Sequence, residues 1–120
     1  MRGFGLTLER LASGAVRIAP RGELDLEHAY TFDEELRKVE EEWPPCIVLD
    51  LRELTFMDSC GMGRLLAARH RARRAERRLL LVRGGRAVQY LIALAGAEEA
   101  FEMVADVPGS LRRAEAPVSQ

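Results

Sequence analysis

The chain has 120 residues, of which 48% are hydrophobic and 31% are charged, and its formal net charge is -1. This balance fits one globular domain with a full hydrophobic core, and it excludes a disordered chain. The small net charge gives no reason to expect nucleic-acid binding, and no window approaches the roughly 18 apolar residues of a membrane span.

A hairpin is predicted over residues 4–19, because apolar side chains alternate with small or polar ones in two segments. Ser13 and Gly14 are the turn signal between the segments, and Pro20 and Gly22 are expected to close the hairpin. The alternating apolar positions are Phe4, Leu6, Leu8, Val16 and Ile18.

An amphipathic helix is predicted from Leu26 to Glu42, with its acids facing outward and Pro44 stopping it. Residues 46–51 form a short continuous apolar run, which is typical of a strand covered on both faces. A brief extended piece over residues 54–57 should follow.

A second helix should then start at Asp58 or Ser59, either of which could cap it by accepting backbone N–H bonds. It is expected to bury Leu65 and three alanines and to turn its arginines to solvent. Seven arginines and one acid lie between Arg64 and Arg78. Those arginines could bind nucleic acid or an acidic protein surface, but a solvated face is the favoured interpretation because no aromatic residues interleave with them.

The remaining elements continue the alternation of strands and helices. A buried strand is expected over residues 79–82, a helix over 87–95 with Gly96 as its C-cap, and a short strand over 101–104. A terminal helix starting within 108–113 and a flexible tail over 114–120 would complete the chain.

This order predicts a single α/β domain with a mixed, mostly parallel sheet, an antiparallel hairpin at its amino-terminal edge and about four helices. Right-handed crossovers should bring the turn Gly22–Asp25 and the loop Asp58–Gly61 to the same end of the sheet.

Patterns typical of enzymes are weak or missing. Gly61 and Gly63 open a helix after a strand, but Leu66 stands where a dinucleotide-binding loop needs a third glycine. His28 and His70 are isolated and are interpreted as surface helix residues rather than metal ligands. Cys46 and Cys60 are too few and too far apart for a disulfide framework or a zinc site, and they fit a reducing cytoplasm. We therefore expect no enzyme activity, no metal and no cofactor.

Two segments carry a resemblance to a known family. Residues 22–25 read GELD, and residues 50–63 read DLRELTFMDSCGMG. From Gly22 onward the chain resembles the STAS domain, and most closely the bacterial anti-sigma factor antagonists. The first segment resembles the family's G-E-[IL]-D turn, and the second resembles its signature around a phosphorylated serine. The order of strands and helices fits the same family, which implies a STAS domain over residues 1–113.

The signature differs from the family at two positions. Arg52 replaces a common small polar residue, and we expect it to lie harmlessly on an exposed loop. Cys60 stands where the family usually has Ser or Thr, so the match assigns the phosphate acceptor to Ser59 alone. The thiol near a helix start could have a redox role, but simple replacement of the serine is favoured.

The resemblance implies a function in partner switching. It implies that the unmodified protein binds an anti-sigma factor, often itself a serine kinase, and so releases a sigma factor in the cytoplasm. Phosphorylation of Ser59 by that kinase would inactivate the protein, and a PP2C-type phosphatase would reverse it. Neither direct nucleic-acid contact nor membrane insertion is expected. The residues expected to contact the partner are Glu23, Asp25, Asp58, Ser59, Cys60, Gly61 and Arg64.

Two alternatives remain. A STAS module could instead be a non-switching scaffold subunit of a sensory or transport-associated complex. A phosphoaspartate receiver domain would use Asp50, which ends a buried strand. A receiver also needs a pair of acids after its first strand and a lysine late in the chain. No adjacent acid pair ends the first hairpin, and the only lysine is Lys38 on the first helix, so the receiver interpretation is disfavoured.

Overall fold

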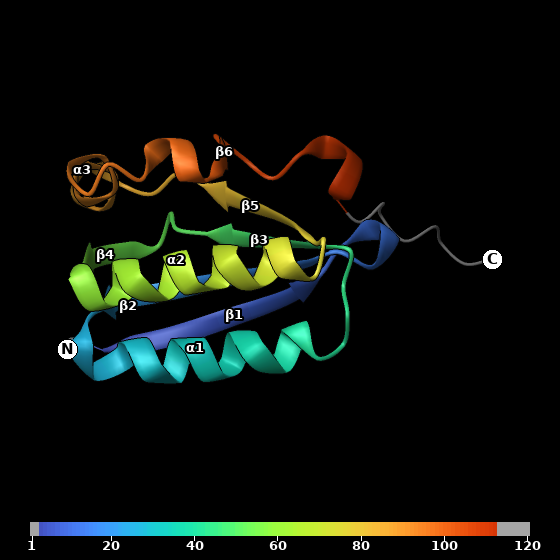
Figure 1. The fold of residues 1–120 in the computed structure, drawn as a ribbon, viewed down its shortest axis with the longest axis horizontal. Coiled ribbons are helices and arrows are strands. Elements are labelled where there is room, and N and C mark those ends of the chain that lie inside the picture. The colour runs from blue at the N-terminus through green and yellow to red at the C-terminus, as the bar shows by residue number, and fades with distance from the viewer. Residues whose placement is uncertain (1–2, 113–120) are drawn as a thin grey trace.

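The computed structural model describes residues 3–112, within which three α-helices and six strands are found (Figure 1). Short 3-10 turns lie at residues 12–14, 98–100 and 109–111. No helix among these described residues is long and apolar enough to cross a bilayer. The elements are, in chain order, β1 Phe4–Arg10, β2 Val16–Leu24, α1 Leu26–Glu40, β3 Cys46–Asp50, β4 Leu54–Met57, α2 Ser59–Arg74, β5 Arg78–Val82, α3 Arg86–Leu94 and β6 Glu102–Val104.

All six strands form one mixed sheet. Its order is β1-β2-β3-β5-β6, and β4 pairs with β2 beyond the stretch where β2 pairs with β3. Only the β1–β2 pair is antiparallel, and every other pairing is parallel. The predicted fold class and the amino-terminal hairpin are therefore confirmed.

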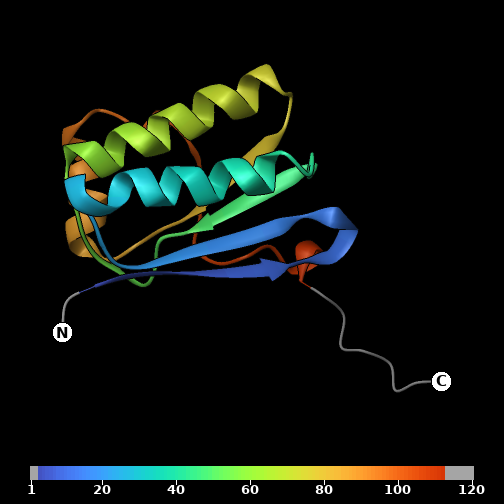
Figure 2. The same cartoon turned by 90° about the horizontal axis from the view of Figure 1, so that it is seen from below.

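The sheet is covered on both faces. α1 and α2 lie side by side over one face, as seen from below in Figure 2. On the other face, Val48 and Val82 pack in a smaller cluster with Val107 from the carboxyl-terminal segment. Their neighbours Leu49 and Leu81 belong to the larger core under the helices. This alternation explains why β3 and β5 read as continuous apolar runs.

The prediction that Pro20 closes the hairpin is wrong, because β2 continues through it to Leu24. β2 pairs with β3 only over residues 16–18 and with β4 only from Gly22 onward. Pro20 therefore falls in the gap between two partner strands. β1 still pairs with Pro20, through Leu6, but on the other edge of β2 neither β3 nor β4 requires an N–H from this residue, so a proline is tolerated there.

Gly22 lies at an irregularity of β2, shortly before α1 begins. Its φ is +91°, and the register between β2 and β4 shifts between Gly22 and Glu23. A Cβ at Gly22 would meet the carbonyl oxygen of Gly3 at 1.9 Å. Only glycine suits both the positive φ and this close approach.

The described carboxyl-terminal end holds less helix than predicted. The expected terminal helix is only the single 3-10 turn Gly109–Leu111, so the described residues contain three α-helices rather than about four. Arg113 and the expected tail over residues 114–120 lie outside the described residues. Gly96 does follow the end of α3 with a φ of +67°, as a C-terminal glycine should.

The prediction that α2 turns all its arginines to solvent is wrong for Arg71, which lies between α1 and α2. Its guanidinium donates to Glu40 at 2.7 Å and to Asp33 at 3.1 Å. Burial alone would raise the pKa of Asp33, but its hydrogen bond with Arg37 and the charge of Arg71 outweigh burial and lower this pKa. These ion pairs join the two helices over the sheet.

Arg52 is not a passive loop residue either. Its side chain donates to both carboxylate oxygens of Asp50, at 2.9 and 2.7 Å, and also reaches Asp106 at 3.1 Å. Arg17 donates to the same Asp50 carboxylate at 2.9 Å. Asp50 is only 1% exposed. Burial would raise its pKa, but the bonds from Arg52 and Arg17 lower it below the ordinary value.

Candidate functional site at the start of two helices

α1 and α2 begin at the same end of the sheet, where β2 and β4 finish (Figure 1). Asp25 caps α1 by accepting the backbone N–H of His28 at 3.1 Å. Asp58 caps α2 by accepting the N–H groups of Cys60 and Gly61 at 2.9 and 3.1 Å. The structure therefore brings together the two loops that the sequence predicted to meet.

Asp58 also connects the two helices directly. Its second carboxylate oxygen accepts the backbone N–H of Leu26 at 3.1 Å, and its own N–H donates to the carbonyl of Leu24 at 3.3 Å. One side chain thus satisfies backbone donors at the start of both helices. The arrangement fixes α1 and α2 relative to each other at this end.

Ser59 is the first residue of α2, and its side chain is exposed. Of the two candidate caps, Asp58 is the one that caps the helix, and Ser59 does not. Among the residues that the structure describes, none forms a hydrogen bond with the Ser59 hydroxyl. This hydroxyl is free to react without breaking a contact that supports the fold.

Gly61 lets α2 start close to β2. A Cβ at this position would lie 2.3 Å from the carbonyl oxygen of Leu24. Gly63, one half-turn later, faces open space instead, since a Cβ there would have no neighbour within 4 Å. The two glycines therefore have different roles, and only Gly61 is required for packing.

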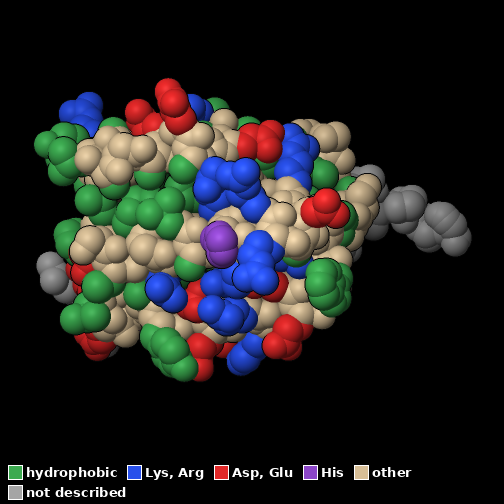
Figure 3. Space-filling model, in the orientation of Figure 1, with side chains coloured by type: hydrophobic (Ala, Val, Ile, Leu, Met, Phe, Trp, Pro, Cys, Tyr) green, Lys and Arg blue, Asp and Glu red, His purple; other side chains and the backbone are tan. Residues whose placement is uncertain are grey.

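An open hollow of about 390 Å³ lies between the first turns of α1 and α2. Two large apolar side chains stand at its rim: Leu26 is 75% exposed and Tyr30 is 70% exposed. Figure 3 shows hydrophobic side chains toward this end of the face and arginines over the second half of α2. The residues lining the hollow are Leu26, Ala29, Tyr30, Ser59, Cys60, Gly63 and Arg64.

Leu26 and Tyr30 were not among the residues predicted to contact a partner. The buried stripe of α1 runs through Ala29, Phe32 and Leu36, and Leu26 and Tyr30 lie off it. An apolar pair spaced four residues apart on the outer face of an amphipathic helix was the available signal.

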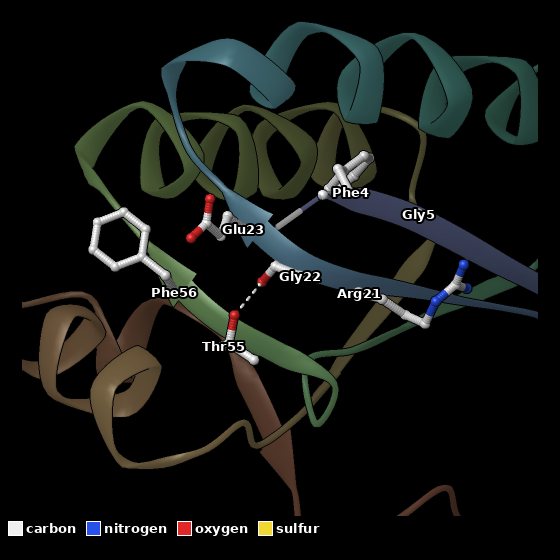
Figure 4. Close-up of a pocket in the computed structure, with 8 residues that line it drawn as sticks. Phe4, Gly5, Arg21, Gly22, Glu23, Thr55 and Phe56 are labelled. Atoms are coloured by element: carbon white, nitrogen blue, oxygen red, sulfur yellow. Dashed lines mark hydrogen bonds between the residues drawn. The ribbon is translucent and has the colours of Figure 1, made fainter. Parts of the chain in front are cut away.

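Most of the predicted partner-contacting residues gather here, but Glu23 does not. Asp25, Asp58, Ser59, Cys60 and Arg64 lie at or beside the hollow, with Gly61 buried beneath it. Glu23 lines a different hollow of about 660 Å³ with Phe56 and Thr55, whose hydroxyl donates to the Gly22 carbonyl at 3.1 Å (Figure 4). Glu23 therefore does not line the hollow that contains Ser59, although it was predicted to contact the same partner.

His28 has a structural role at this end of the sheet. The Nδ1 atom of His28 lies 2.8 Å from the Asp25 carboxylate, and its ring stacks on Phe4 with a centroid separation of 5.3 Å. His28 is half-buried, and its stacking on Phe4 links α1 to β1.

Metal-ligating side chains do not gather at this site within the part of the chain that the structure describes. The described residues hold no group of three His, Cys, Asp or Glu side chains that could bind a metal ion. Asp50, the acceptor in the receiver alternative, has both carboxylate oxygens engaged by arginines. The site presents the exposed Ser59 hydroxyl beside an apolar rim and two helix caps. This arrangement is suited to protein binding.

Comparison with known proteins agrees with this geometry. The family model of the STAS domain matches residues 10–109. The chain belongs to the STAS domain family. No match was found among curated proteins.

Several solved structures share this STAS fold. An anti-sigma factor antagonist from Mycobacterium paratuberculosis is 24% identical, with a TM-score of 0.80 and 88% of each chain covered. The anti-sigma factor antagonist SpoIIAA in its unphosphorylated form is 21% identical, with a TM-score of 0.71 over 83% of this chain and 88% of that one. Phosphorylated SpoIIAA from Bacillus is 20% identical, with a TM-score of 0.66 over 83% and 91%.

Proposed function

We propose that this STAS domain is an anti-sigma factor antagonist whose binding is switched by phosphorylation of Ser59. In its unmodified form it binds an anti-sigma factor that is also a serine kinase, and this releases a sigma factor. Similarity to antagonist structures supports this proposal, among them one protein known in both phosphorylated and unphosphorylated forms.

The observation that carries the proposal is the state of the Ser59 hydroxyl. It is exposed at the first turn of α2, it lies within the family signature, and Asp58 holds the cap in its place. A phosphate could therefore be added there without breaking a hydrogen bond of the fold. The start of a helix also tolerates an anion because the positive end of the helix dipole lies there.

The binding surface would comprise the Asp58–Gly61 loop, Asp25 and the hollow with its apolar rim. Exposed Leu26 and Tyr30 could insert into a partner, since aromatic and large apolar side chains often dominate binding energy. Phosphorylation would place about -1.5 to -2 charges beside this rim. Such a charge costs desolvation in a close interface, and each ~1.4 kcal/mol lost weakens binding tenfold.

The reaction itself would belong to the partner. In the kinase, the Ser59 oxygen would bond to the γ-phosphorus of ATP, the bond to ADP would break, and the hydroxyl proton would pass to a base of the kinase. A PP2C-type phosphatase would hydrolyse the phosphoserine and restore the binding form. The STAS domain would act as a binding protein in the cytoplasm rather than as an enzyme.

The direct test is to incubate the purified protein with ATP and the serine kinase encoded in the same genome, and to locate the phosphate by mass spectrometry. We expect phosphate on Ser59 and none in a Ser59→Ala variant. Ser13 and Ser110 are the other two serines among the described residues and are internal controls. A kinase that binds the protein but leaves Ser59 unmodified would favour the non-switching scaffold instead.

A further inference from the structure

Arg64 is held in its present position only weakly. Its guanidinium lies 3.6 Å from the carboxylate of Asp33, beyond hydrogen-bonding distance, and its side chain is 40% exposed. Asp33 has two closer arginines, Arg37 at 2.9 Å and Arg71 at 3.1 Å. Asp33 would therefore stay paired if Arg64 moved away.

The path from Arg64 toward Ser59 is open. Ser59 and Gly63 are four residues apart and so lie on one side of α2, and the glycine leaves this side bare. A Cβ at Gly63 would meet nothing within 4 Å, and Ser59, Gly63 and Arg64 line the same hollow. Helical side chains lean toward the amino terminus of their helix, which directs Arg64 toward the turn that carries Ser59.

A phosphate on Ser59 would be stabilised by a cation nearby. Asp58 directly precedes Ser59, and its carboxylate repels a second negative group. Tyr30 and Cys60 also face the hollow, but Arg64 is the one basic residue among the described residues that line it. A guanidinium binds a phosphate with two parallel hydrogen bonds, which makes it the suited partner.

We propose that Arg64 is the binding residue for a phosphoryl group on Ser59. This inference rests on the phosphorylation proposed above. On modification, the Arg64 side chain leaves Asp33, crosses the bare surface at Gly63 and pairs with the phosphate. The guanidinium then fills the hollow beside Leu26 and Tyr30, so the partner loses the shape of its binding surface as well as meeting the added charge.

The experiment is a pH titration of the phosphoserine by ³¹P NMR, on protein made with phosphoserine incorporated at position 59. The second ionisation of phosphoserine has a pKa of about 6, and a paired cation lowers it. We expect Arg64→Gln to raise this titration midpoint by about half a unit or more relative to the unsubstituted phosphoprotein, and Arg64→Lys to raise it less. Arg69→Gln is the matched control, because Arg69 lies on the same helix but outside the hollow.

A second measurement observes Arg64 itself. The Arg64 side-chain N–H signal should shift on phosphorylation, and the corresponding signal of Arg69 should not. A midpoint that is equal in the unsubstituted and Arg64→Gln phosphoproteins would overturn the assignment of Arg64. That failure is separate from a failure of the proposed function, in which the partner would bind phosphorylated and unphosphorylated protein equally well.

Discussion

The carboxylate of Asp58 accepts the backbone N–H of Leu26 across 32 residues of sequence, at 3.1 Å. The same side chain caps α2 through Cys60 and Gly61. One residue thus sets the start of α2 and holds the start of α1 beside it. The free Ser59 hydroxyl and the hollow next to it both depend on this placement.

Substitution of the cap residue Asp58 should destabilise the fold, whereas substitution of the neighbouring Ser59 should not. Asp58→Ala is expected to lower the free energy of unfolding by about 1–2 kcal/mol, since three backbone donors lose their acceptor. Ser59→Ala should change it by less than about 0.5 kcal/mol, because this hydroxyl supports no contact among the described residues. Urea unfolding of both variants measures the difference, and an equal loss in the two would contradict the assignment of the cap.

The two glycines at the start of α2 should respond in opposite directions. Gly61→Ala should destabilise the protein by about 2 kcal/mol or more, because its Cβ would press against the carbonyl of Leu24. Gly63→Ala should be neutral or stabilise by up to about 1 kcal/mol, since alanine favours the helix and the space is open. Thermal unfolding followed by circular dichroism would test this pair, and a large loss for Gly63→Ala would be inconsistent with the open hollow.

Acid should weaken the fold through Asp33 and Asp50, the two buried carboxylates within residues 3–112. The folded-state pKa values of Asp33 and Asp50 lie below the ordinary value of about 3.9, so the unfolded chain binds more protons at low pH. Their contribution is fully present above about pH 5 and is lost as the pH falls through about 4 and then through the lower folded values. Urea titrations at several pH values between 3 and 7 should show this decline.

Asp50→Asn is the matched variant for the acid prediction. It should cost about 3 kcal/mol at pH 7, because Arg17 and Arg52 would lose their anion, and it should make stability fall less steeply toward low pH. If the variant had the same pH dependence as the unsubstituted protein, Asp50 would have no part in acid sensitivity.

The apolar rim should matter for partner binding and not for stability. Leu26→Ala and Tyr30→Ala should each weaken binding of the anti-sigma factor by about tenfold or more, because exposed anchors contribute mainly when an interface covers them. Trp43→Ala is the control: Trp43 is similarly exposed, at 73%, but follows the end of α1 that is far from Ser59. Isothermal titration calorimetry would distinguish the variants, and an equal effect of Trp43→Ala would argue against a surface centred on the hollow.

The order of elements could be predicted from the sequence because each one carries a local signal. The turn at Ser13 and Gly14, the prolines after α1 and the acidic cap before α2 all act on their immediate neighbours. The meeting of the two helix starts was also predictable, since parallel strands place their following loops at one end of the sheet.

The remaining features depend on contacts between distant residues. Pro20 continues β2 only because β3 and β4 leave a gap beside it. Arg71 is held by Glu40, which lies far from it in the sequence. Arg52 is held mainly by the nearby Asp50, but it also reaches the distant Asp106. A hydropathy pattern cannot show which acid an arginine will face, so these residues were assigned to solvent.

The most direct test of the switch compares the affinity of the purified anti-sigma factor for two variants at one position. Ser59→Ala keeps the site uncharged, and Ser59→Asp places one negative charge beside the hollow. We expect Ser59→Ala to bind like the unmodified protein and Ser59→Asp to bind about 100-fold more weakly or worse, a difference of roughly 2.8 kcal/mol. Equal dissociation constants for the two variants would contradict the switch.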